Sequence, residues 1–339
     1  MRTIALALAF LSLLAAPASP QDSAKKKAVI CTLPVLKAIA DELGGGDFDV
    51  TAISKADQDP HGVSPTPDLK KKVYQADLFI EIGLQLELWA EDVAGGSGNP
   101  KVAKGAPGRI VASAGISPEE VPDVLSRSQG DVHPEGNPHL WMDPIRVKAV
   151  AKNIAEGLKA AAPDKEKAIL ERLKKFQDRI DESLFGKELL ADVGARALTR
   201  KALDGSLQDY LKEKNKLDKL GGWLKKGAAL KGQKVVEFHK TWVYFAKLFG
   251  FELVGSVQPK PGISPGPKDL AALAATMQKQ GVKIIIVDNF YPTAEPKALA
   301  VQTGAKVAVV PDQPGGEPGT EDYFKFVDFV LDRLVEAVK

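Results

Sequence analysis

The side chains that could bind a metal ion are few in this sequence of 339 residues. The chain contains four histidines, which are His61, His133, His139 and His239, and one cysteine, Cys31. A single cysteine cannot form an intrachain disulfide or supply the several thiolates of a zinc cluster. Cys31 lies in an apolar run, and we expect it to be a small buried side chain. Any metal site must therefore use imidazole and carboxylate ligands.

Two of the histidines lie in proline-containing turns. His61 is part of the turn DPHGVSPTP (59–67), which follows a predicted strand and precedes a predicted helix. His139 is part of NPHLWMDP (137–144), directly before another predicted helix, and Trp141 is placed to shield it from water. The prolines restrict the backbone of both turns, as a preorganised ligand loop requires. A surface histidine in a rigid turn would show the same pattern.

The third histidine and two aspartates follow predicted strands. His239 comes directly after the strand residues 235–238, and Thr241 is placed to cap the helix that follows. Asp288 and Asp312 come just after two later strands. In open α/β sheets, ligands bind beyond the carboxyl ends of the strands. These side chains are therefore candidates for one shared site.

Three neutral imidazoles and one carboxylate suit tetrahedral zinc, which favours nitrogen ligands. Spacings of 78 and 100 residues separate His61, His139 and His239, so only the fold can bring them together. The remaining histidine, His133, lies in the polar loop 126–136. We expect it to be a solvent-facing residue or a transient metal contact, and not a structural ligand.

Short apolar runs alternate along the chain with amphipathic stretches that end in glycine, which predicts alternating strands and helices. This pattern is typical of an α/β protein with mostly parallel sheets flanked by helices. It occurs twice, in a first lobe over 28–142 and a second lobe over 235–339. The predicted strands are 28–32, 50–54, 78–82, 234–238, 252–257, 283–287 and 306–310, and the predicted helices are 34–43, one that begins at 66–67, 243–249, 268–280, 294–303 and 321–338.

A helical region separates the two lobes. Asp143 and Pro144 are a good N-cap and first-turn pair, and they open a long helical pattern over 143–185 that Pro163 interrupts. We expect this pattern to form a long connecting helix between the lobes.

The segment 186–234 is a charged, helix-prone insertion. Its part from Lys212 to Lys234 contains eight lysines against only two acidic residues. A solvated helix face accounts for this excess, and a docking patch for an acidic partner is the alternative.

The overall charge and hydropathy restrict partners and location. Lysine plus arginine (46) nearly balance aspartate plus glutamate (44), which leaves no global field to attract nucleic acid or an anionic membrane. The apolar run 4–14 is too short to span a bilayer, and the small residues AAPA (15–18) that follow it are typical of an export signal. We expect a signal peptide over 1–18 and a secreted or periplasmic mature protein. No cysteine lies at the cleavage site and no later stretch is long enough to span a membrane, so we expect neither a lipid anchor nor membrane insertion.

Several sequence runs together resemble the periplasmic zinc and manganese receptors of ABC importers, and the matches extend over most of the mature chain. The runs are DPHGVSPTPDLK (59–70), ADLFIEIGLQLELW (76–89), NPHLWMDP (137–144), VEFHKTWVYFAKLFG (236–250), PKPGISP (259–265) and LAVQTGAKV (299–307). The resemblance implies two lobes joined by one long helix, with a metal bound in the cleft between them. It also implies an ABC permease in the membrane as the partner of a monomeric receptor.

The resemblance assigns metal ligands to His61, His139 and His239. Manganese receptors usually have a carboxylate at the position of His239, so the match favours zinc as the transported ion and manganese less. The fourth ligand corresponds to an aspartate after the last strand, here Asp312, with Asp288 as the reserve. Many zinc receptors have a long histidine-rich loop before the second ligand, whereas this chain has only His133 there. The segment 186–234 is also longer than the usual passage into the second lobe.

Two other functions are compatible with parts of the sequence. A secreted zinc hydrolase would also use three histidines with an open fourth position. However, the chain has no His-Glu-x-x-His helix and no close His-x-His pair, and a hydrolase needs a general base beside the metal. An adhesin or structural protein would account for the export signal but would leave the histidines in the turns without a role. We therefore expect a metal-binding receptor and not an enzyme.

Overall fold

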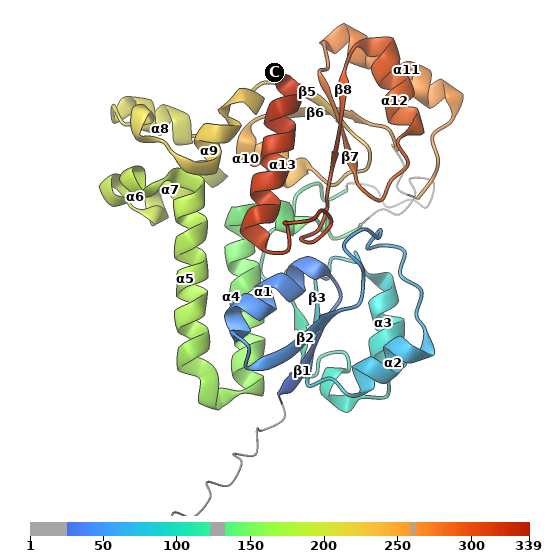
Figure 1. Ribbon diagram of the computed structural model, residues 1–339, viewed down its shortest axis with the longest axis vertical. Coiled ribbons are helices and arrows are strands. Elements are labelled where there is room, and N and C mark those ends of the chain that lie inside the picture. The colour runs from blue at the N-terminus through green and yellow to red at the C-terminus, as the bar shows by residue number, and fades with distance from the viewer. Residues whose placement is uncertain (1–25, 123–132, 259–261) are drawn as a thin grey trace, which may run out of the picture.

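The computed structural model describes residues 26–122, 133–258 and 262–339. The predicted signal peptide (1–18) lies outside the described residues, as do parts of the loop 126–136 and of the run 259–265. Two four-stranded parallel sheets with flanking helices form two lobes (Figure 1), which confirms the predicted α/β fold class. Within the described ranges, no helix combines the length and apolar character needed to cross a membrane.

The sheet of the first lobe has the strand order β2-β1-β3-β4, and all of its neighbouring strands are parallel. Its strands are β1 (Lys27–Cys31), β2 (Phe48–Ala52), β3 (Leu78–Glu81) and β4 (Arg109–Val111). The lobe also contains the helices α1 (Pro34–Gly44), α2 (Pro67–Tyr74) and α3 (Leu88–Gly95) and a 3₁₀ turn at Pro100–Val102. The predicted start of α2 is confirmed, because the Thr66 hydroxyl accepts a hydrogen bond from the amide of Leu69. Cys31 is fully buried, as expected.

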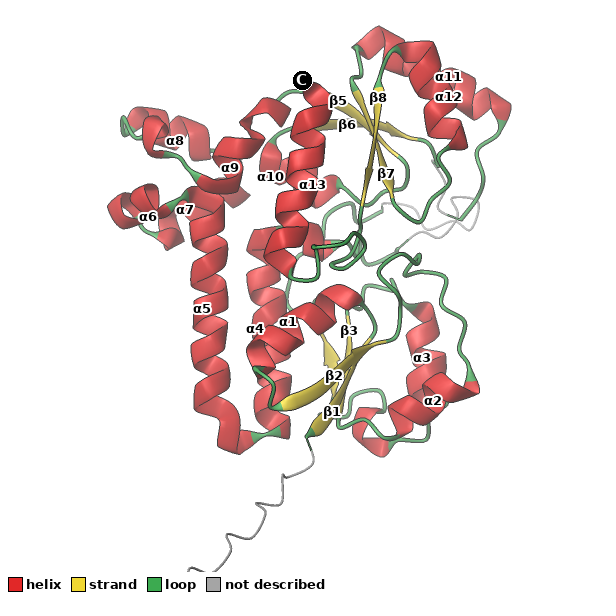
Figure 2. Ribbon diagram, viewed as in Figure 1, coloured by secondary structure: helices red, strands yellow, loops and turns green. Residues whose placement is uncertain are grey.

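The second lobe repeats this topology with the strand order β6-β5-β7-β8. Its strands are β5 (Lys234–Glu237), β6 (Glu252–Ser256), β7 (Ile284–Asp288) and β8 (Lys306–Val310). Its helices are α10 (Val243–Phe249), α11 (Pro267–Gln280), α12 (Ala294–Thr303) and α13 (Tyr323–Val338). The loops after the strands of both sheets lie between the lobes (Figure 2). The fold therefore brings the candidate ligands, which follow strands or lie in turns, to the boundary between the lobes.

The helical region between the lobes is a hairpin of two helices and not one continuous helix. Helix α4 (Pro144–Ala161) begins at Asp143, whose carboxylate accepts a hydrogen bond from the amide of Ile145, as the sequence predicts. A 3₁₀ turn at Pro163–Lys165 follows, and the chain reverses because proline cannot continue the hydrogen bonding of α4. Helix α5 (Glu166–Phe185) then runs back along α4 and leads toward the second lobe (Figure 1).

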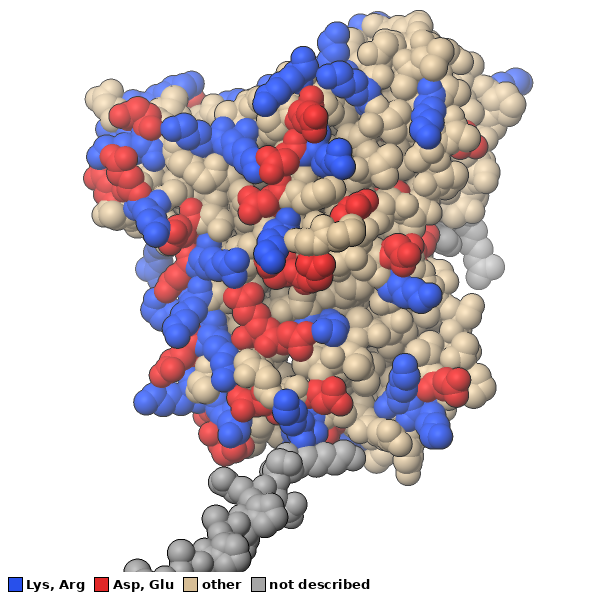
Figure 3. All heavy atoms as spheres, in the orientation of Figure 1, with Lys and Arg blue, Asp and Glu red and all other residues tan. Residues whose placement is uncertain are grey.

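We call residues 186–234 the side segment, because in Figure 1 it projects to the side of the α4–α5 hairpin. It contains α6 (Lys187–Val193), α7 (Ala195–Leu203), α8 (Leu207–Glu213), α9 (Gly222–Lys226) and 3₁₀ turns at Leu217–Lys219 and Gly227–Leu230. Basic and acidic side chains are interspersed over this side of the molecule (Figure 3). Several lysines of the side segment form surface ion pairs, such as Lys216 and Lys219 with Asp192 and Lys226 with Asp332. Local pairing thus offsets much of its positive charge.

One cluster of buried side chains extends through both lobes. It includes Val29 and Ile80 of the first sheet, Val235 and Ile286 of the second, and many residues of α4, α5, α13 and the side segment. The outer faces of the two sheets have separate, smaller clusters under α2 and α3 and under α11 and α12. The lobes are therefore joined by a common core as well as by the chain.

Gly227 tests how tightly the side segment packs on the second lobe. Its backbone φ is negative, so alanine would cause no backbone strain, but an added Cβ would overlap the ring of Phe249. We expect Gly227→Ala to lower the free energy of unfolding by about 1–3 kcal/mol, the usual cost of overpacking. Gly95→Ala is the control, because this exposed position in α3 should gain helix propensity. Urea unfolding measures both, and equal stability of the two variants would contradict the packing.

Candidate metal centre

Three of the four histidines converge at the boundary between the lobes. Among the described residues, ring nitrogens of His61, His139 and His239 lie within 4.8 Å of one another. Their ring centroids are 5.5 Å apart for His61 and His139, 5.2 Å for His61 and His239, and 5.7 Å for His139 and His239. Three imidazoles at these distances can surround a single ion.

Each histidine is placed by a different part of the fold. His61 lies in the turn between β2 and α2 of the first lobe. His139 lies directly before a 3₁₀ turn at Leu140–Met142, which leads into α4, and the buried ring of Trp141 lies 5.1 Å from it. His239 is the second residue after β5 of the second lobe. The group of three therefore needs both lobes.

One ring nitrogen of each histidine is held by an oxygen acceptor. The Nδ1 atoms of His61 and His139 lie 2.8 and 2.9 Å from Oδ1 of Asp59 and Asn137. The same oxygens accept the backbone N–H groups of His61 and His139. An atom that accepts a backbone N–H bond cannot be the amide nitrogen of the asparagine, so in both pairs the ring Nδ1 carries the proton and donates.

His239 shows the same arrangement with a weaker bond. Its Nδ1 lies 3.3 Å from Oε1 of Gln258, and this oxygen also accepts the backbone N–H of Gly262. With Nδ1 protonated in all three rings, the lone pair of each ring lies on Nε2, and that of His61 faces the Nε2 of His133 at 3.2 Å. This is the tautomer of a histidine that binds a metal through Nε2 and is oriented through Nδ1.

Burial keeps two of these rings neutral. His139 and His239 are only 2% and 3% exposed. Burial, together with the neighbouring imidazoles, lowers the pKa of His239 to about 3 and the pKa of His139 well below its ordinary value. Neutral imidazole can donate a lone pair at once, whereas imidazolium must first lose a proton.

Asp312 is the better of the two candidate carboxylates. It is buried, and burial raises its pKa to about 7. Its Oδ2 accepts a hydrogen bond from Gln313, whereas its Oδ1 has no partner among the described residues. A buried carboxylate oxygen without a partner is costly unless a cation or a proton reaches it. Asp312 lies outside the 4.8 Å group of the three histidines, so its role as a fourth ligand stays a prediction.

Asp288 is already engaged in hydrogen bonds. Its Oδ1 accepts from the indole of Trp242 at 3.1 Å, and its Oδ2 accepts from the hydroxyl of Thr241 at 3.3 Å. The prediction that Thr241 caps the following helix is therefore wrong. Its hydroxyl is used by Asp288, and the amide of Trp242 donates to Glu237 instead.

The prediction that His133 faces solvent is wrong. Its ring is partly buried, and its Nε2 lies 3.2 Å from Nε2 of His61. Burial and the adjacent His61 lower the pKa of His133 to about 4. The fold brings the end of the polar loop back over the site, which loop composition alone could not predict. A transient metal contact, the other predicted role, stays a prediction.

Sequence reasoning missed the side chains that orient the histidines. Asp59 and Asn137 each precede a histidine by two residues, in the repeated pattern Asp/Asn-Pro-His. A short side chain that accepts the N–H two residues ahead is typical of such turns, so this repeat was a usable signal. No comparable signal marks Gln258, or Tyr291, whose hydroxyl lies 3.5 Å from Oδ2 of Asp59 across the boundary between the lobes.

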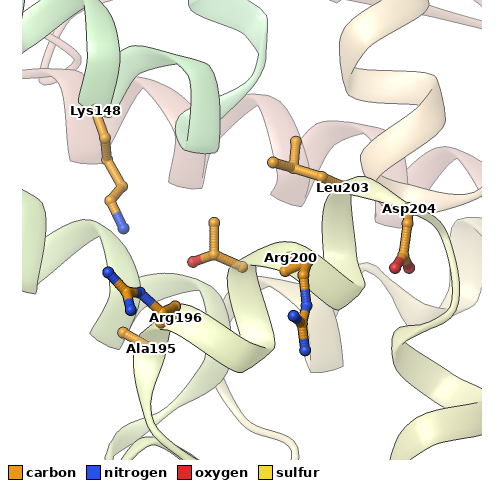
Figure 4. A pocket seen from close by; sticks show the side chains of 7 residues that line it. Lys148, Ala195, Arg196, Arg200, Leu203 and Asp204 are labelled. Atoms are coloured by element: carbon orange, nitrogen blue, oxygen red, sulfur yellow. The ribbon is translucent and has the colours of Figure 1, made fainter.

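A cavity of about 650 Å³ lies at the side segment and contains no histidine. Figure 4 shows Lys148, Arg196 and Arg200 among its lining residues. The ammonium group of Lys148 is held by both carboxylate oxygens of Asp181 at 2.6 and 2.8 Å. The lining of the cavity is mostly basic and apolar, which does not suit a cation. The histidine group therefore remains the candidate metal site.

Comparisons with known proteins agree with this architecture. The zinc-binding protein AdcA of Streptococcus pyogenes is 26% identical over 277 residues, which cover 78% of this chain and 46% of AdcA. The chain thus spans about half the length of that relative. The iron-binding protein YfeA of Yersinia pestis is 24% identical over 97% of this chain and 93% of its own length.

A solved structure of ZnuA has the same fold. It superposes with a TM-score of 0.69 at 18% identity and covers 93% of this chain and 100% of its own. The sequence profile of the family described as zinc-uptake complex component A, periplasmic, matches residues 29–184 and 202–337, which is most of the chain. The chain therefore belongs to the zinc-uptake complex component A family.

Proposed function

We propose that this protein is an extracytoplasmic receptor that captures zinc between its two lobes and delivers it to an ABC permease. The observation that carries this proposal is the convergence of three imidazoles from both lobes of the fold, each with its Nδ1 held by an oxygen acceptor and its lone pair on Nε2. His61, His139 and His239 are the proposed ligands, with Asp312 completing the coordination.

The ligand atoms favour zinc over manganese. Imidazole nitrogen suits zinc, whereas manganese prefers carboxylate, carbonyl and water oxygen and ranks below zinc for most sites. The relatives include proteins named for zinc, iron and manganese, so the preference rests on the ligand atoms of this chain. Three nitrogens against one carboxylate support zinc as the cargo.

The burial of the site argues for a receptor and against a hydrolase. His139 and His239 are almost completely buried, so a peptide or ester could not reach an ion that they hold. The permease is the partner that the receptor role requires, and a monomer is sufficient for delivery. The family is described as periplasmic, which supports an extracytoplasmic location, and removal of the proposed signal peptide 1–18 would release the protein there.

Elemental analysis of the mature protein, purified from its own compartment without added metal, tests the proposal directly. We expect about one zinc ion per chain and no zinc-dependent peptidase or esterase turnover. Manganese or iron in place of zinc would change the cargo, and zinc-dependent turnover would contradict the receptor role.

Alanine variants test the proposed histidine ligands. We expect His61→Ala, His139→Ala and His239→Ala each to weaken zinc binding by at least about 100-fold, because each removes a ligand from a buried site. His133→Ala should weaken it by less than about tenfold, because His133 contacts only one edge of the group. Isothermal titration of the four variants measures this order, and the largest loss in His133→Ala would show that the ligand set is wrong.

The two aspartates give a matched pair of variants. Asp312→Asn should weaken zinc binding, because it removes the charge of a carboxylate with a free oxygen. Asp288→Asn should change zinc affinity little, because both of its oxygens already accept hydrogen bonds from Thr241 and Trp242. Competition with a fluorescent zinc chelator measures both affinities. If the effects are reversed, Asp288 takes the place of Asp312.

The lowered pKa values predict how many protons zinc displaces. At pH 5.5, three ordinary histidines would together release nearly three protons on binding, since their pKa is about 6.5. His139 and His239 stay neutral at this pH because their pKa values are lowered, so they should release none. Titration calorimetry in two buffers of different ionisation enthalpy measures the number. Asp312→Asn removes the contribution of that carboxyl, and release of nearly three protons by this variant would contradict the shifts.

A further inference from the structure

The side chain of Asn137 makes four hydrogen bonds, one of which reaches the second lobe. Its Oδ1 accepts from the backbone N–H of His139 at 3.0 Å and from the ring Nδ1 at 2.9 Å. Its Nδ2 donates to Oε2 of Glu120 at 2.9 Å and to the backbone carbonyl of Lys240 at 2.7 Å. The residue is only 5% exposed. One buried amide thus uses both of its ends.

The partner of Nδ2 lies in the second lobe, directly beside a candidate ligand. Lys240 is the residue after His239, so a bond to its carbonyl holds the backbone that carries the His239 ring. The oxygen end of the same amide fixes the orientation and tautomer of His139. The two ligands are therefore connected through a single side chain.

Tyr244 of α10 reinforces this connection. Its hydroxyl donates to the backbone carbonyl of Asn137 at 2.5 Å and accepts from the amide of Glu119 at 3.0 Å. The guanidinium of Arg146 lies 4.7 Å from the centre of the Tyr244 ring. Lys247, also on α10, forms an ion pair with Glu119. Contacts from the second lobe thus hold the turn around Asn137 on two sides.

We propose that Asn137 is a positioning residue that sets the geometry of His139 and His239 together. This inference rests on the proposed function, because it assigns the two histidines to one metal site. Asn137 does not ligate the ion. It keeps the His139 lone pair on Nε2 and holds the loop of the other lobe at the distance that a shared ion requires. Side chains that orient metal ligands commonly change affinity by tenfold or more when removed.

Asn99 provides a matched control. It is also 5% exposed, and its Nδ2 donates to the carbonyls of Val73 and Ala76 at 2.9 and 2.8 Å. Its Oδ1 accepts from the amide of Lys101 at 3.0 Å. All of these partners lie in the first lobe, away from the histidines. Asn99→Ala should therefore cost stability as Asn137→Ala does, without affecting the site.

The decisive measurement is the tautomer of His139 in the metal-free protein, from the ¹⁵N shifts of its ring nitrogens. The wild type and Asn99→Ala should show the proton on Nδ1, and Asn137→Ala should show a mixture of tautomers. Zinc titration should give about a tenfold or greater loss of affinity for Asn137→Ala and no loss for Asn99→Ala. An unchanged tautomer with unchanged affinity in Asn137→Ala would overturn the proposal.

The variant Asn137→Asp separates the effect of the oxygen end of the amide from the effect of its nitrogen end. A carboxylate can still accept from His139, so the Nδ1 tautomer should return, but it cannot donate to the carbonyl of Lys240. Zinc affinity should recover only in part, even though the added negative charge favours a cation. Full recovery would show that the contact with Lys240 does not matter and would overturn the coupling. A wild-type protein that binds no zinc would refute the proposed function, whereas the tautomer measurement would still test the role of Asn137.

Discussion

The convergence of three imidazole rings, each held at Nδ1 so that its lone pair lies on Nε2, is the constraint on which the rest of the structure depends. A neutral imidazole has one donor and one acceptor, and a buried group left without a partner costs about 1–3 kcal/mol. In His61, His139 and His239 the donor side is satisfied by oxygen atoms of nearby side chains, and the acceptor sides converge. The Nε2 of His61 also lies 3.2 Å from Nε2 of His133. A cation placed between the rings would accept the lone pairs that meet there.

The surrounding fold holds the three converging rings in place. The indole of Trp141, two residues after His139, donates to the carbonyl of Asp312 at 2.8 Å, and the hydroxyl of Tyr323 donates to the carbonyl of Trp141 at 2.9 Å. These bonds connect the first lobe to the end of β8 and to α13. The core that the lobes share prevents them from separating freely. The ligands are therefore largely in place before an ion arrives, which lowers the cost of ordering them on binding.

Much of the fold and most of the site could be predicted from the sequence, because the signals were local. The buried strand β7 contains the continuous apolar run Ile284–Val287, and helix α12 has the bounds that its pattern and Gly304 predict. Strand β4 has only three residues and no buried one, so it gives no pattern. The reversal after α4 and the position of His133 against His61 depend on packing between distant segments. The orientation of the histidine rings was missed for a different reason, since the repeat Asp/Asn-Pro-His was present but not interpreted.

The side segment shows how a family member can add structure without disturbing the site. Residues 185–201 lie between the two parts of the chain that match the family profile. Leu189 and Leu198 of this stretch are nevertheless buried in the shared core. Further along, the amide of Gly221 donates to the carbonyl of Phe185 at the end of α5, and the indole of Trp223 donates to Asp328 of α13 at 2.8 Å. The segment therefore braces α5 of the hairpin against α13 of the second lobe. Among the described residues, no hydrogen bond or ion pair joins the segment to the histidines or to the residues that orient them, so its length could change in evolution while the distance between the two halves of the metal site stayed fixed.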